Sequence, residues 1–107
     1  MDKRRKYIAV VDTETLGVDK PLVYDLGVTI TDKQGNIYHQ KNWIIKEVFT
    51  NQKRMETAYY YEKVPKYKQM LKNGDCVLVN WETARKEFNE IINIHNVSVL
   101  SAYNLGF

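Results

Sequence analysis

The stretch that decides the fold is YIAVVDTE, at residues 7–14, in which a continuous apolar run stops at two carboxylates. A short uninterrupted apolar run is typical of a strand buried on both faces in the middle of an α/β sheet. The polar residues that follow, up to Gly17, predict that this strand ends at Asp12. Ligand sites in open α/β sheets lie just beyond the carboxyl ends of such strands, so a site is expected here.

Asp12 and Glu14 are two residues apart, and an extended backbone directs both side chains to the same face. Two neighbouring carboxylates repel each other when they are ionised, and a divalent cation or a shared proton relieves that repulsion. Carboxylate oxygens are ligands that suit Mg²⁺ or Mn²⁺. The pair therefore indicates a candidate metal site, and the alternative is an ordinary solvated start of a loop.

The segments outward from this stretch predict the order β-β-β-α-β. Residues 22–31 and 37–45 are β-rich and are joined by turn-forming residues at 32–36, which predicts an antiparallel hairpin. An amphipathic helix is expected over 81–94. Residues 97–103 are then expected to form a strand parallel to the first one, because a crossover helix precedes it.

The helical segments are indicated by their start and stop signals. Residues 55–63 and 67–72 are expected to be helical, with Pro65 as a break between them and Gly74 as a stop. Asn80 is a plausible N-cap of the long helix. The apolar face of that helix is expected to carry Trp81, Ala84, Phe88, Ile91, Ile92 and His95.

The segment VVDTETLG, at residues 10–17, resembles the first motif of the DnaQ-like (DEDD superfamily) 3′–5′ exonucleases. The segment DLGV at 25–28 agrees with the second strand of that family. The ending AYNLGF, at 102–107, is similar to the family's second motif, in which an Asn, two residues and a Phe precede a metal-binding Asp. The resemblance spans essentially the whole chain. It implies one domain over residues 1–107 with an α/β, ribonuclease H-like mixed sheet, made of antiparallel hairpin strands and a parallel strand after the crossover helix, incomplete at its C-terminus.

The resemblance also implies an activity, namely metal-dependent hydrolysis of terminal phosphodiesters of single-stranded DNA or RNA from the 3′ end. Asp12 and Glu14 match the family's catalytic metal ligands in a two-metal site for Mg²⁺ or Mn²⁺. Thr15 and Leu16 match positions that meet the terminal nucleotide, with Leu16 against the base. Asn104 matches an asparagine that helps to shape the substrate cleft.

The sequence departs from the family pattern at its end. It stops at Phe107, one residue before the position of the second-motif Asp, and it lacks the third motif with its general base and last Asp. His39 and His95 are expected to be structural and not replacements for that base. The chain is therefore expected to be an N-terminal portion that is inactive alone. Its uncovered sheet face and edge would recruit a second copy or the missing C-terminal segment.

The alternative to the enzyme is a non-catalytic module with the same fold that binds protein or nucleic acid, because a fold does not determine a function. The reading frame beyond Phe107 separates the two hypotheses. An Asp directly after Phe107 and a later His-x-x-x-x-Asp would favour the enzyme, whereas a stop codon would favour the module.

Composition sets the remaining limits. Aromatic residues make up 12% of the 107 residues, which excludes disorder as a description of the whole chain. No apolar run is long enough to span a membrane, no signal peptide is evident, and a cytoplasmic location is expected. A single cysteine, Cys76, excludes an internal disulfide and is expected to be an inert, partly buried thiol.

The net charge of +3 permits a nucleic-acid partner. Four lysines could line a groove for it, and the alternative is that they form an ordinary solvated face of a helix. These residues are Lys63, Lys66, Lys68 and Lys72.

Overall fold

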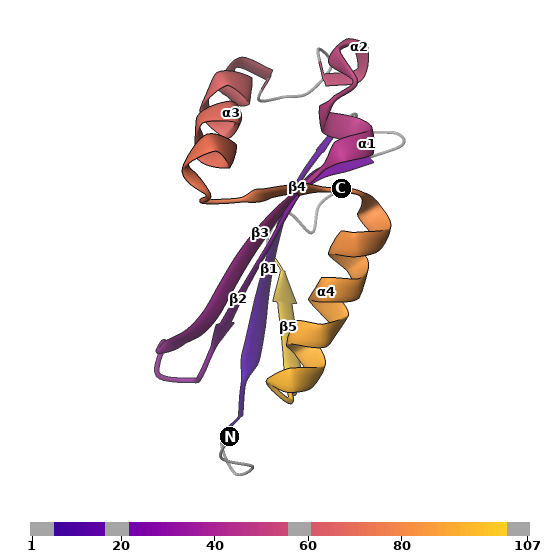
Figure 1. Ribbon diagram of the computed structural model, residues 1–107. Helices are drawn as coiled ribbons and strands as arrows, with labels where there is room; N and C mark the ends of the chain where they lie inside the picture. The colour runs from indigo at the N-terminus through magenta and orange to yellow at the C-terminus, as the bar shows by residue number, and fades with distance from the viewer. Residues whose placement is uncertain (1–5, 17–21, 56–60, 103–107) are drawn as a thin grey trace.

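A five-stranded mixed sheet forms the centre of the computed structural model, which describes residues 6–16, 22–55 and 61–102 (Figure 1). Its spatial order is β4-β3-β2-β1-β5. The first three strands are antiparallel, β5 runs parallel to β1, and β4 runs parallel to β3. The α/β class, the hairpin and the parallel strand are confirmed, whereas β4 was not predicted. The strands are β1 (Ile8–Leu16), β2 (Leu22–Thr31), β3 (Ile37–Ile45), β4 (Val77–Val79) and β5 (Val99–Ala102).

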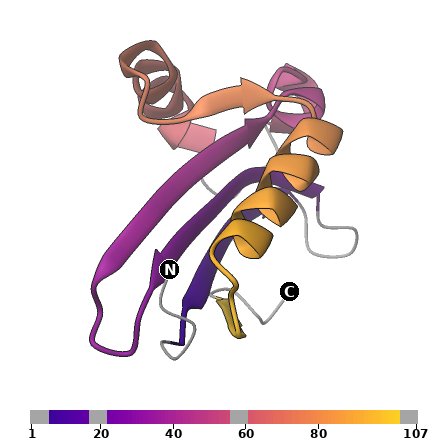
Figure 2. The ribbon, with the colours of Figure 1, turned by 60° about the horizontal axis from the view of Figure 1, so that its bottom comes forward.

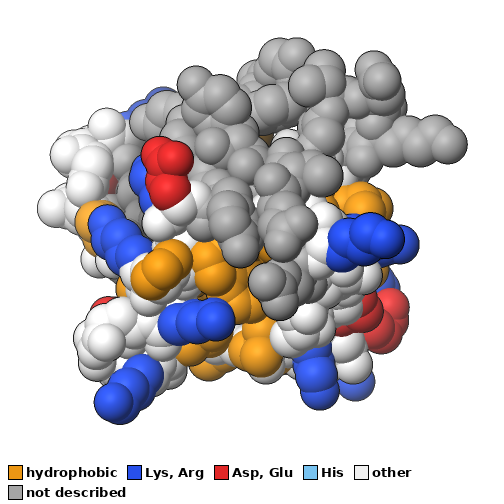
Figure 3. Space-filling model, turned by 90° about the horizontal axis from the view of Figure 1, so that it is seen from above, with side chains coloured by type: hydrophobic (Ala, Val, Ile, Leu, Met, Phe, Trp, Pro, Cys, Tyr) orange, Lys and Arg blue, Asp and Glu red, His pale blue; other side chains and the backbone are white. Residues whose placement is uncertain are grey.

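The helices lie in two places on this sheet. The long helix α4 packs on one face of the sheet (Figure 2). Trp43 on β3 lies edge-on to Phe88 on α4 with ring centroids 6.3 Å apart, and Lys41 pairs with Glu87 at 3.7 Å. The shorter helices gather at one end of the sheet, where Lys and Arg side chains surround hydrophobic ones (Figure 3). The helical elements are α1 (Lys46–Phe49), α2 (Gln52–Met55), the 3₁₀ turn η1 (Tyr61–Lys63), α3 (Val64–Asn73) and α4 (Trp81–Ile94).

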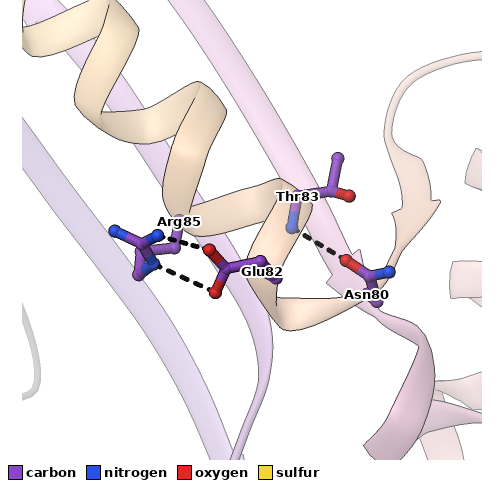
Figure 4. Close-up of polar contacts among 4 residues, drawn as sticks. All are labelled: Asn80, Glu82, Thr83 and Arg85. Carbon is purple, nitrogen blue, oxygen red and sulfur yellow. Dashed lines mark hydrogen bonds and ion pairs between the residues drawn. The ribbon is translucent and has the colours of Figure 1, made fainter.

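The start of α4 is fixed as the sequence predicts. The Asn80 side chain accepts a hydrogen bond from the backbone N–H of Thr83 at 2.8 Å, which satisfies one of the free donors at the helix start (Figure 4). Glu82 forms an ion pair with Arg85 on the exposed side of the first turn. The prediction for the buried face needs one correction, because Trp81 is 43% exposed. It is the first residue of α4, and its backbone N–H donates to the Glu47 carboxylate at 2.9 Å.

Strand β1 is longer than predicted. It does not end at Asp12 but continues to Leu16, because its backbone pairs with β2 throughout, with Asp12 opposite Gly27 and Glu14 opposite Asp25. Polar side chains do not end a strand whose backbone groups find partners in the ladder. The prediction of a strand buried on both faces is also wrong, since Ala9 is fully buried but Val10 only half-buried.

Pro65 has a different place from the one predicted. It lies in the first turn of α3, where the missing N–H needs no partner, so it starts this helix and does not separate it from a later one. Gly74 has φ +82° at the helix end, which confirms the predicted stop. The helix expected over 55–63 is only partly testable, because residues 56–60 lie outside the described residues. Residues 61–63 form a 3₁₀ turn.

Burial divides the molecule into a well-packed interior and an exposed edge. The largest fully buried side chains include Trp43, Ile30 and Ile44, and Cys76 is buried as well. Burial raises the pKa of the Cys76 thiol, so the prediction of an inert thiol agrees with its surroundings.

Strand β5 lies at the edge of the described sheet with all four residues exposed. Within the described ranges, no helix combines the length and apolar character needed to cross a membrane.

Asp32 closes the β2–β3 turn and supports the first stability prediction. Its buried carboxylate accepts hydrogen bonds from the backbone N–H groups of Gln34 and Asn36, and from the Tyr38 hydroxyl at 2.7 Å. Hydrogen bonds from Asn36 and Tyr38 hold the pKa of Asp32 far below its usual range.

Asp32→Asn is therefore expected to lower the midpoint of thermal unfolding by several degrees at neutral pH. Because the folded pKa is depressed, this stabilisation is present above the unfolded pKa of about 4 and shrinks as the pH falls further. Circular dichroism melts of the variant and of Lys33→Gln, an exposed control in the same turn, measure the difference. A deficit that stays constant from neutral pH to well below pH ~4 would refute the role of the Asp32 charge.

Candidate metal site on the open sheet face

The sheet face opposite α4 carries an open cavity of about 420 Å³. The strand register explains its lining, since Asp12, Gly27 and Asn42 lie side by side on β1, β2 and β3. The residues that pack against α4, such as Trp43, point to the other face by the alternation of the strand. The cavity is lined by Val10, Asp12, Gly27, Val28, Thr29, Gln40, Lys41, Asn42 and Asp75.

Asp12 lines this cavity, and Glu14 lies two residues further along β1, opposite Asp25 on β2. The ladder with β2 is regular between them, so both side chains share the open face as predicted. Asp12 is exposed and Glu14 is half-buried. Burial raises the pKa of Glu14, the negative charges of Asp12 and Asp25 raise it further, and Lys63 partly opposes them. Three carboxylates thus repel one another at this point, and a cation stabilises such an arrangement.

Asp25 is the member of this group that sequence reasoning missed. It lies opposite Glu14 on β2 and accepts a hydrogen bond from the Tyr67 hydroxyl at 2.7 Å. The Asn42 amide donates to the other oxygen of Asp25 and to the Leu26 carbonyl. Burial raises the pKa of Asp25, although the hydrogen bonds from Asn42 and Tyr67 oppose this effect. The available signal was the antiparallel pairing of β1 with β2, because its register places DLGV, at 25–28, opposite VDTE, at 11–14.

The other predicted site residues lie apart from this group or outside the described residues. Thr15 is half-buried and follows an irregularity in the β1–β2 ladder. Leu16 is 3% exposed and belongs to the hydrophobic core, so its contact with a base stays a prediction. Asn104 lies outside the described residues. His39 and His95 stack on the α4 side with ring centroids 5.4 Å apart, and His95 contacts the Ile91 carbonyl through Nδ1 at 2.9 Å.

The donor set at Asp12 and Glu14 is chemically suited to a hard divalent cation. Carboxylate oxygens that share one face of a strand favour Mg²⁺ or Mn²⁺ over softer metals. Among residues 6–16, 22–55 and 61–102, no group of three or more His, Cys, Asp and Glu side chains is arranged to hold a metal ion. Asp12 and Glu14 would thus supply two protein ligands, and water would complete the coordination.

Comparisons with protein-family models, curated proteins and solved structures found no match for this chain.

The raised pKa of Glu14 leads to a stability prediction that needs no ligand. A carboxyl with a raised folded pKa destabilises the fold above that pKa, and the penalty vanishes below the unfolded pKa of about 4.3. Glu14→Gln is expected to raise the unfolding midpoint at neutral pH, by on the order of 2 °C because the group is half-exposed. The gain should disappear below pH ~4.

Thermal melts at the two pH values measure this effect, with Glu90→Gln on the exposed side of α4 as the control. A neutral-pH melt in which Glu14→Gln is no more stable than the unchanged chain would show that the carboxylate repulsion is negligible.

Proposed function

We propose that this chain carries part of the catalytic site of a metal-dependent 3′–5′ exonuclease with a ribonuclease H-like fold, as its resemblance to the DnaQ-like family implies. The observation that carries the proposal is the placement of Asp12 and Glu14. They lie on the open face of an internal strand, where Asp12 lines a cavity and Glu14 lies beside a third carboxylate, Asp25.

The topology around the site supports this proposal. The antiparallel β1–β2–β3 unit, then α4, then β5 parallel to β1, follows the order that the resemblance implies. The additional strand β4 lies at the far edge beside β3, away from Asp12 and Glu14. Strand β1, which carries Asp12 and Glu14, therefore lies between β2 and β5, as the proposed fold implies.

The residues of the chain have separable roles in this proposal. Asp12 and Glu14 would hold Mg²⁺ or Mn²⁺, and such an ion, when bound, lowers the pKa of a water and stabilises charge on a leaving oxygen. Asp25 is fixed by Tyr67 and Asn42, so its charge stays next to Glu14 and strengthens the attraction for a cation. The cavity along β1, β2 and β3 offers an open surface for a single strand.

The test of this proposal is a cleavage assay on 5′-labelled single-stranded DNA and RNA with Mg²⁺ or Mn²⁺. It compares the 107-residue chain with a polypeptide extended beyond Phe107 through the second-motif Asp and the third motif that the resemblance implies. The chain alone is expected to give no ladder, because residues that act as one catalytic unit lose most of their effect when members are absent. The extended polypeptide is expected to shorten substrates from the 3′ end.

A 3′-blocked oligonucleotide and a circular single strand are the controls, and both are expected to resist cleavage. An extended polypeptide that is inert with both metals but retains the single strand would refute the exonuclease and favour the binding module. Robust laddering by the 107-residue chain alone would refute the prediction that it lacks metal ligands that cleavage requires.

A further inference from the structure

A second, smaller cavity of about 150 Å³ lies where α3 begins, next to the carboxylate group. It is lined by one carboxylate, Asp25, and by residues from η1 and α3. Two of these residues, Lys63 and Lys66, are lysines. The cavity therefore has two cationic side chains next to a carboxylate that already accepts two hydrogen bonds. The lining residues are Asp25, Lys63, Lys66, Tyr67 and Met70.

Packing holds this part of α3 in place over the sheet. The Tyr67 hydroxyl is hydrogen-bonded to Asp25 at 2.7 Å. The Tyr67 ring lies edge-on to Tyr24 and Phe49, with centroids 6.0 and 5.9 Å apart. Lys63 lies four residues before Tyr67, and Lys66 lies four residues before Met70. Residues at this spacing are neighbours on a helix surface, and all four line the same cavity. The two ammonium groups are thus presented at the cavity by a rigid element.

The charge distribution supports an anionic ligand. Residues 46–73 contain seven Lys and Arg but only three Glu, although the whole chain carries only +3. The end of the molecule formed by α1, α2 and α3 shows Lys and Arg side chains around a hydrophobic centre (Figure 3). The cavity that Lys63 and Lys66 line also includes Asp25, which lies opposite Glu14 in the β1–β2 ladder.

We propose that Lys63 and Lys66 bind backbone phosphates of the single strand whose 3′ end reaches Asp12 and Glu14. This inference rests on the proposed function and adds the residues that hold the substrate. A cluster of carboxylates repels a phosphodiester, so cationic groups beside it are needed to keep the strand in reach. Lys68 and Lys72 lie on α3, as Lys66 does, but do not line the cavity, which makes them controls of equal charge.

The test measures binding without catalysis. Fluorescence anisotropy follows 5′-labelled (dT) and (U) single strands of about 15 nucleotides in EDTA, over a series of salt concentrations. For single strands, each phosphate contact contributes about 0.7 to the slope of log affinity against log salt. Lys63→Gln/Lys66→Gln is expected to reduce that slope by roughly 1.4 and to weaken binding at low salt for both strands.

The control is Lys68→Gln/Lys72→Gln, which removes the same amount of charge from α3 and is expected to change the slope much less. Equal effects of the two double variants, a loss confined to RNA, or no measurable binding by the unchanged chain would each overturn the phosphate role. Circular dichroism verifies that both double variants are folded.

Failure of this inference is separable from failure of the proposed function. Binding in EDTA requires no metal ion, whereas the exonuclease proposal requires one at Asp12 and Glu14. Lys63→Gln/Lys66→Gln is expected to retain Mn²⁺ binding, because neither lysine is a ligand. A double variant that binds the single strand normally would remove the phosphate role and leave the metal site standing.

Discussion

Replacing Asp12 or Glu14 by alanine is expected to reduce 3′-end cleavage by the extended polypeptide roughly a thousandfold or more. Each variant removes one of the carboxylates that would hold the metal ions, and residues that act as one catalytic unit lose most of their effect when a member is absent. The fold is expected to survive, because Asp12 is exposed and Glu14 is destabilised by its neighbours. Loss of activity should therefore be accompanied by an unchanged or higher unfolding midpoint.

The control for these variants is Glu90→Ala, which removes an exposed carboxylate from α4 on the opposite side of the sheet. It is expected to leave cleavage unchanged. The assay uses the 5′-labelled single strand with Mg²⁺ and with Mn²⁺, and melts are recorded on the same samples. Cleavage that persists in both Asp12→Ala and Glu14→Ala would remove these residues from the catalytic site.

The largest effect on stability is expected from Trp43→Ala. Trp43 is fully buried between the sheet and α4, where its ring lies edge-on to Phe88. Truncating a buried tryptophan to alanine costs about 3–5 kcal/mol, and small domains have only about 5–15 kcal/mol of total stability. The variant is therefore expected to be largely unfolded at moderate temperature or urea concentration.

Two tryptophan variants complete this experiment. Trp81→Ala is expected to cost little, because Trp81 is 43% exposed. Trp43→Phe is expected to cost far less than Trp43→Ala, since it keeps an aromatic ring and removes a buried Nε1–H that finds no acceptor within the described part of the chain. Urea titrations of the three variants give the free energies. Similar losses for Trp43→Ala and Trp81→Ala would contradict the packing described for α4.

Periodicity predicted the long elements well because it reports burial directly. The strands at 22–31 and 37–45 and the helix at 81–94 have the predicted bounds, and Asn80 caps that helix as expected. The three residues of β4 give no comparable signal, since their pairing depends on β3 being beside them. The end of β1 was missed because polar composition suggested an exit, whereas backbone pairing with β2 determines where the strand stops.

The candidate site was predictable only as far as local geometry reaches. The shared face of Asp12 and Glu14 follows from the alternation of one strand, so the sequence was sufficient. Asp25 joins them through the register of a hairpin, and Tyr67 reaches Asp25 across 42 positions of sequence. Contacts of that separation depend on tertiary packing. Leu16 was expected in a loop, but the extension of β1 carries it into the core.

The most direct test of the central claim, that Asp12 and Glu14 hold a divalent cation, is Mn²⁺ titration of the isotopically labelled 107-residue chain followed by NMR. Two carboxylates leave most of the coordination to water, so weak binding with a dissociation constant on the order of 1 mM is expected. Paramagnetic broadening is predicted to centre on residues 12–16 and to extend to Asp25, and Asp12→Ala should abolish it. Broadening centred elsewhere, or unchanged in Asp12→Ala, would contradict the claim.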